Sequence, residues 1–152
     1  MTRRTVTTRD NAGQPGRASA SWPRESFIFA DDPYTPMPDL LDITGRPRVL
    51  IYGPYENLGP GRWRARIEFE LLEEAGLGHF MVEFGYVLTW AHVKFRGSGP
   101  GRYAVEVDHD LQEATRMEIR FTLMKAALHG GLRLLGVRID PAPVGAIAAS
   151  DS

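Results

Sequence analysis

The chain has 152 residues, of which 43% are hydrophobic and 24% are charged, and its formal net charge is −1. This composition predicts one soluble globular domain, and the near-zero charge argues against a nucleic-acid partner. The chain has no cysteine, which excludes disulfides, thiolate metal sites and cysteine nucleophiles.

The sequence shows neither an apolar leader segment nor a stretch long enough to cross a membrane. We therefore expect a cytoplasmic protein with no membrane partner. Release from the cell, or attachment to its surface, would then require that the chain is part of a larger assembly.

The first 40 residues differ in character from the rest. Residues 1–25 are polar, lack periodicity and hold five arginines against two acidic residues, so we expect a disordered or extended basic arm. Three prolines between residues 33 and 38 exclude a helix from the next segment. Trp22 and the trio at residues 27–29 are too apolar for a free tail. Residues 1–40 are therefore expected to dock on a protein partner or on a second copy of the chain.

Two similar turns, at residues 59–63 and 99–103, each read Gly-Pro-Gly-Arg followed by an aromatic residue. Proline presets φ for the first corner of a turn, and the following glycine accepts a positive φ. Each turn opens an alternation of apolar and polar residues with a period of two, which indicates a strand with one buried face. The aromatic residues, Trp63 and Tyr103, are the first inward positions of these two strands.

Similar alternation continues along the chain. The expected strands cover residues 48–52, 62–72, 80–86, 89–95, about 102–108, 117–123 and 132–139. Gly53-Pro54 is expected to end the first of these, and residues 125–128 could form one helical turn. The alternation in the last strand changes phase near Gly136, which predicts a β-bulge there.

These elements predict an all-β fold, a two-sheet antiparallel β-sandwich of the jelly-roll type with an extended N-terminal arm. A small β-barrel is the alternative. The expected organisation is the arm at residues 1–25, the sandwich domain at 26–140 and a flexible C-terminal tail at 141–152.

Three aromatic residues are candidates for the surface. Trp90 is out of phase with the apolar positions of its strand and shares a face with His92. Tyr52 and Tyr55 flank the Gly53-Pro54 corner. Sugar rings have apolar faces that stack on exposed tryptophan and tyrosine, and their hydroxyls bind polar side chains. The alternative for Trp90 is that both faces of its strand are buried.

No catalytic constellation is visible in the sequence, and we expect no enzymatic activity. Every serine lies in a tail or beside a glycine turn, and none forms a Gly-x-Ser-x-Gly elbow. Asp108 and Asp110 flank His109 and would lie on one side of the strand, so this cluster could hold a hard cation such as Ca²⁺ through oxygen ligands. An ordinary polar strand end is the alternative, and no other cofactor is expected. His129, beside two glycines, could donate to a ligand or to a buried carbonyl.

Three parts of the sequence resemble a group of bacterial β-sandwich domains. They are residues 42–48, the corner Tyr52-Gly53-Pro54-Tyr55 with the Gly61-Arg62-Trp63 that follows, and the late segment 127–133. That group carries a YGPY…LPxGxW opening and an AxHGxLR strand near its end. Such domains occur beside glycosyltransferases and other sugar-related proteins and look similar to carbohydrate-binding modules. The resemblance covers about residues 40–140, and Leu58-Gly59-Pro60 replaces the usual Leu-Pro.

The resemblance and the out-of-phase aromatics lead to one hypothesis, non-catalytic recognition of a bacterial surface or capsular polysaccharide. Trp90, Tyr52 and Tyr55 would stack on sugars. The polar neighbours that would bind hydroxyls are His92, Glu118, Arg120 and His129. The rival hypothesis is a structural subunit of a larger phage-like or appendage particle, with the N-terminal arm docked on a neighbour.

Overall fold

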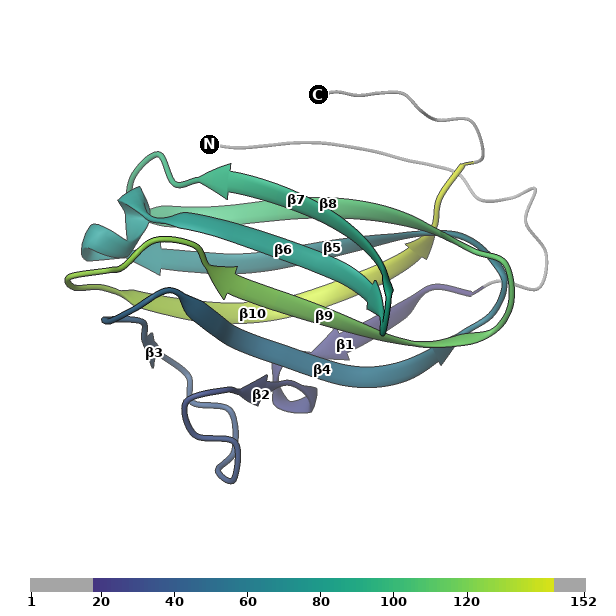
Figure 1. Cartoon of the computed structure of the whole chain (residues 1–152), viewed down its shortest axis with the longest axis horizontal. Helices are drawn as coiled ribbons and strands as arrows, with labels where there is room; N and C mark the ends of the chain where they lie inside the picture. Colours follow the sequence, from purple (N-terminus) through teal and green to yellow (C-terminus); the bar gives the residue numbers. More distant parts are fainter. Residues whose placement is uncertain (1–17, 144–152) are drawn as a thin grey trace.

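The computed structural model describes residues 18–143, which form ten strands and two short 3-10 helices arranged as a sandwich (Figure 1). The elements in chain order are β1 Ala20–Pro23, η1 Arg24–Ser26, β2 Ile28–Phe29, β3 Leu41–Asp42, β4 Arg48–Leu58, β5 Gly61–Leu72, η2 Glu73–Leu77, β6 His79–Tyr86, β7 Thr89–Arg96, β8 Gly101–Leu111, β9 Thr115–Leu123 and β10 Gly131–Pro141. None of the helices within residues 18–143 is long and apolar enough to cross a membrane.

The strands form two antiparallel sheets of five strands each. Sheet A has the order β1-β10-β5-β8, with β3 also pairing with β10, and sheet B has the order β2-β4-β9-β6-β7. From β4 to β10 the chain crosses between the sheets at every connection except the β6–β7 hairpin. This crossing pattern is that of a jelly roll, so the expected two-sheet antiparallel sandwich is confirmed.

The two similar turns start neighbouring strands of sheet A, because β5 and β8 pair along their whole length. Gly61 and Gly101, which follow the turn prolines, have the expected positive φ of 126° and 146°. Trp63 is 3% exposed. The Tyr103 ring stacks on Phe69 with ring centroids 5.6 Å apart. Both aromatic residues therefore face inward, as the alternation predicts.

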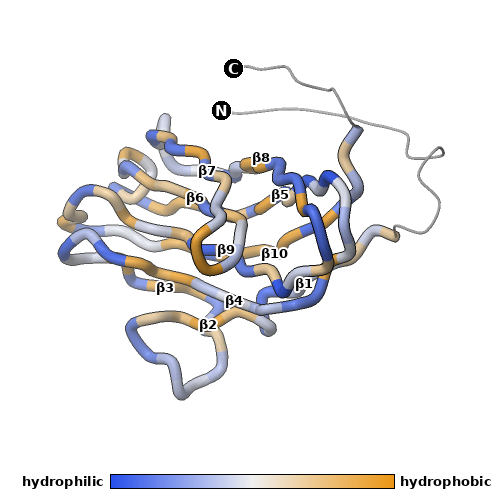
Figure 2. Tube along the Cα trace, turned by 45° about the vertical axis from the view of Figure 1, so that its right-hand side comes forward, coloured by the Kyte–Doolittle hydropathy of each residue, from blue (hydrophilic) through white to orange (hydrophobic). Residues whose placement is uncertain are grey.

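Aromatic side chains from both sheets fill the space between them. Phe69 of sheet A meets Phe121 of sheet B edge to face, with centroids 4.9 Å apart, and Phe80 and Phe95 pack around Phe121. Figure 2 shows hydrophobic and hydrophilic positions alternating along the strands. The buried faces of the two sheets thus form one shared core, which sets the phase of every outward-facing residue.

Three local expectations differ from the structure. β4 does not end at Tyr52 but continues through Pro54 to Leu58. Pairing with β2 ends at Tyr52, so no ladder on that side needs an N–H from Pro54, and a bulge between Pro54 and Glu56 accommodates Tyr55 in the pairing with β9. β8 continues to Leu111. Residues 125–128 form no helical turn, because Ala127 instead bridges to Gly45. The bulge expected near Gly136 is present.

The boundaries of the sandwich are wider than 26–140. β1 pairs with β10, and Trp22 is 5% exposed, so residues 20–23 belong to sheet A and not to an arm, and residues 24 and 25 lie in η1. β2 pairs with β4, so residues 28–29 also bind their own chain. At the other end, Pro141 belongs to β10 and Ala142 is buried. The rest of the expected arm and tail, residues 1–17 and 144–152, lies outside the described residues.

Candidate functional site

The outer face of sheet A neutralises its own charges. Arg64 binds Asp108 through two hydrogen bonds of 2.7 and 2.9 Å, and Arg62 binds Asp110 at 3.0 Å. Asp108 raises the pKa of the Arg64 guanidinium, mainly through these hydrogen bonds. Arginine thus occupies both carboxylates that the sequence suggested for a cation. Within residues 18–143 no group of three or more histidine, aspartate or glutamate side chains is arranged to hold a metal ion.

The outer face of sheet B gathers different residues, in two rows that cross four strands. Directly opposed residues of an antiparallel pair project to the same side. The first row is Tyr52, Arg120, Glu83 and His92, from β4, β9, β6 and β7. The second row is Pro54, Glu118, Gly85 and Trp90. We call Tyr52, Tyr55, Glu83, Trp90, His92, Glu118 and Arg120 together the sheet B face.

Glu118 is the buried centre of this face. It is 3% exposed, and its Oε2 accepts hydrogen bonds from the Tyr55 hydroxyl at 3.0 Å and from Arg120 Nε at 3.2 Å. Burying a carboxylate costs several kcal/mol unless it is paired and hydrogen-bonded. Glu118 lies on strand β9, between β4 and β6. From this position its carboxylate holds the side chains of Tyr55 and Arg120 in place.

The pKa of the Tyr55 hydroxyl is raised by its surroundings. Its burial and, secondarily, the hydrogen bond to Glu118 raise the pKa of Tyr55 to about 12. The side chain reaches Glu118 because the bulge after Pro54 re-aims it, and the Tyr55 backbone has a positive φ of 69°. Arg116 Nε also donates to the Tyr55 carbonyl at 3.3 Å.

Trp90 is held in one orientation by three neighbours. Its Nε1 donates to the Val87 carbonyl at 2.7 Å, and the Arg120 guanidinium carbon lies 4.4 Å from the ring centroid. The ring also lies against Gly85, since a Cβ added there would be 2.9 Å from Trp90 Cε3. Trp90 is partly exposed and His92 beside it is exposed. The face of β7 that carries Trp90 is therefore open to solvent and is not a second buried layer.

Arg120 and Trp90 form a cation–π pair. The Arg120 side chain is 40% exposed, and of its five N–H donors only the Nε–H bonds to another side chain within residues 18–143. The N–H groups of a guanidinium lie in its own plane, so contact of its face with a tryptophan ring leaves the remaining N–H groups able to donate. The pair thus combines apolar ring surface with unused donors.

The structure places six of the seven predicted ligand-binding residues on the sheet B face. The seventh, His129, lies in the loop before β10, where its Nε2 is 2.9 Å from Glu73 Oε1 and both side chains are exposed. Sequence reasoning did not select Glu83 or Gly85. Both are out of phase with the buried Phe80, Val82 and Phe84 of β6, but only the pairing with β7 and β9 shows that they neighbour Trp90 and Arg120.

No family model and no curated protein matches the sequence. Among solved structures, the chain is similar to the carbohydrate-binding module TmCBM61 in complex with β-1,4-galactotriose, with 9% sequence identity and a TM-score of 0.49. The match covers 84% of this chain and 90% of that chain. No ligand or residue role follows from a likeness at this level.

Proposed function

We propose that the protein is a non-catalytic carbohydrate-binding β-sandwich whose sheet B face recognises a bacterial surface or capsular polysaccharide. One observation carries the proposal. Of the two outer faces, sheet A is covered with ion pairs between its own strands, whereas sheet B exposes a stacked Trp90–Arg120 pair with unused donors.

The chemistry of this face suits a polyhydroxylated polymer. Sugar rings present apolar C–H surface to aromatic rings and a rim of hydroxyls to donors and acceptors. Tyr52 and Trp90 lie on opposite sides of β9 and β6, with Arg120 and Glu83 between them in the rows. A chain that lies across the strands would meet aromatic surface at both ends and hydrogen-bonding groups in the middle.

Glu118 has a positioning role in this proposal. Its side chain is 4% exposed, and its carboxylate is hydrogen-bonded to Tyr55 and Arg120, so it does not reach a ligand on the surface. Glycoside hydrolysis requires two carboxyl groups that flank the scissile bond. Glu83 is the one carboxylate of the sheet B face that is not buried, and this arrangement favours binding over hydrolysis.

Affinity gel electrophoresis tests the proposal. The native protein is run through gels that contain dextran, pectic galactan, polysialic acid or purified capsular polysaccharides, together with the variants Trp90→Ala and Arg120→Ala. We expect at least one polysaccharide to retard the native protein and both variants to lose about tenfold in affinity, which is about 1.4 kcal/mol. Tyr34→Ala is the matched control, because Tyr34 is 97% exposed in the loop between β2 and β3.

Three results would count against the proposal. Uniform mobility across acidic and neutral polysaccharides would remove the function. Retardation that Trp90→Ala and Tyr34→Ala leave equally unchanged would remove the sheet B face as its site. Release of reducing sugar from a retarding polysaccharide would show catalysis in place of simple binding.

A further inference from the structure

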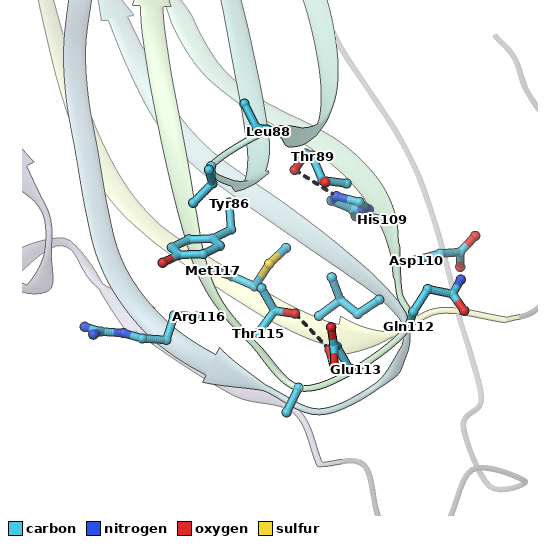
Figure 3. A pocket seen from close by; sticks show the side chains of 13 residues that line it. Tyr86, Leu88, Thr89, His109, Asp110, Gln112, Glu113, Thr115, Arg116 and Met117 are labelled. Carbon is cyan, nitrogen blue, oxygen red and sulfur yellow. Dashed lines mark hydrogen bonds between the residues drawn. The ribbon is translucent and has the colours of Figure 1, made fainter.

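The sandwich interior opens at one end, between the β6–β7 turn and the β8–β9 connection, and leaves a cleft of about 550 Å³ (Figure 3). We call this the end cleft. Its walls are residues 86–89 and residues 109–117. Small-ligand pockets in proteins have volumes of about 300–1,000 Å³, so the end cleft has room for a small ring and is separate from the residues of the sheet B face.

The end cleft occupies inward-facing positions that the core does not fill. Tyr86 continues the inward phase of Phe84, yet it is 40% exposed. His109 continues the inward phase of Val107, and its ring contacts Phe84 edge to face at 6.2 Å. Beneath them the buried Met117 contributes to the lining. At this end an aromatic and an imidazole ring therefore replace the aliphatic side chains that would close the core.

The rim of the end cleft has an apolar side and a polar side. Leu88, at the tip of the β6–β7 turn, is 91% exposed, which is costly for a leucine with no partner. On the other wall, Gln112 and Glu113 are exposed, and their side chains make no hydrogen bond or ion pair with any residue between 18 and 143. Figure 3 shows Tyr86 and Leu88 on one side of the cleft and Gln112 on the other.

Two hydrogen bonds connect the end cleft to the sheet B face. Trp90 Nε1 donates to the carbonyl of Val87, which lines the cleft, and Arg116, also in the lining, donates to the Tyr55 carbonyl. The end cleft and the sheet B face are therefore neighbours at the end of β6 and β9. The buried Leu111 and Met117 line the cleft on the side of the core.

The geometry points to the end cleft as a subsite for the terminal sugar residue of the polysaccharide, an inference that rests on the proposed function. The ring would pack its apolar face on Tyr86 and Leu88, and its hydroxyls would bind Gln112 and Glu113. A terminal residue has free hydroxyls that an internal residue uses in linkages, and the unused acceptors on the polar wall match these hydroxyls. The sheet B face would then bind internal residues, and the protein would recognise chain ends.

Amide NMR titration with single sugars tests this subsite separately from polymer binding. The probes are galactose, glucose, glucuronic acid and N-acetylglucosamine, each added to the full chain. We expect at least one to shift the amides of Leu88, Gln112 and Glu113 and to leave those of Tyr52 and Arg120 unchanged. The variant Tyr34→Ala should keep these shifts, because Tyr34 lies in the loop between β2 and β3 and not in the cleft.

The variant Gln112→Ala with Glu113→Ala should weaken monosaccharide binding about tenfold. Both residues are exposed, so this variant should fold normally, and Glu74→Ala, an exposed glutamate in η2, is the matched control. Shifts that map to the sheet B face, or that the double variant leaves unchanged, would overturn the subsite. Cleft amides that ignore all four sugars while a polysaccharide still binds would overturn the subsite alone. Silence toward every monosaccharide and polysaccharide would overturn both proposals.

Discussion

The hydrogen bond between Tyr55 and Glu118 makes a quantitative prediction about stability in alkali. The substitution Tyr55→Phe removes one hydroxyl and leaves the ring in place. A hydrogen bond to a charged partner contributes about 1.5–3 kcal/mol. Because Tyr55 is partly exposed and Glu118 keeps its bond to Arg120, we expect Tyr55→Phe to lower the free energy of unfolding at pH 7 by about 1–2 kcal/mol.

The sign of the pH dependence follows from the raised pKa. The hydroxyl of Tyr55 has a pKa of about 12 in the folded protein, against 10.0 in the unfolded chain. Between these values the folded protein holds a proton that the unfolded chain has lost, so stability falls as pH rises. The contribution of Tyr55 is therefore present below pH 10 and is lost by about pH 12. The advantage of the native protein over Tyr55→Phe should shrink across the same range.

Urea denaturation followed by tryptophan fluorescence, at pH values from 7 to 12, measures this difference. Other titrating groups are the same in both proteins, so their effects cancel in the comparison. The control is Tyr34→Phe, because Tyr34 is 97% exposed and should show no difference at any pH. Stability curves for native protein and Tyr55→Phe that stay parallel from pH 9 to 12 would refute the assigned Tyr55–Glu118 contact.

Three further outcomes are expected. Gly85→Ala should cost about 1–3 kcal/mol and shift the Trp90 fluorescence, because a Cβ would meet the Trp90 Cα at 2.8 Å; unchanged stability and emission would contradict the packing. Val87 has φ of 53°, which costs a β-branched residue about 1–2 kcal/mol, so Val87→Gly should not destabilise the protein in thermal melts, and a clear loss would be evidence against this turn. Deletion of residues 1–17 should convert an oligomer to a monomer in light scattering if the arm docks on a neighbour, and a protein that is a monomer both with and without these residues would remove the assembly hypothesis.

Sequence patterns predicted the fold and the inward or outward phase of most strand residues. The alternation that begins at Trp63 placed that residue in the core, and its position out of phase with the apolar residues of its strand made Trp90 a candidate for the surface. These predictions succeed because a sheet with one buried face has a strict period of two, which local sequence records directly. The phase change near Gly136 was likewise visible as a bulge.

The end of β4 and the place of the first strands were not predictable in this way. Proline at position 54 suggested a strand end, but β4 continues because pairing with β2 has already ended at Tyr52. Trp22 belongs to an edge strand whose partner, β10, is more than 100 residues away. Edge strands of four residues carry too little periodicity to be recognised without their partner.

Alternation says which side of a strand a residue faces, but it does not say which strand lies beside it. By itself the sequence determined that Trp90 and Tyr52 could be surface aromatics and that Glu118 was out of phase with the core. Only the tertiary structure decided that β9 lies between β4 and β6, which places Glu118 under Tyr55 and Arg120. Long-range pairing also put Asp108 on the opposite sheet. Strand order depends on contacts between residues distant in the chain, and no local pattern encodes those contacts.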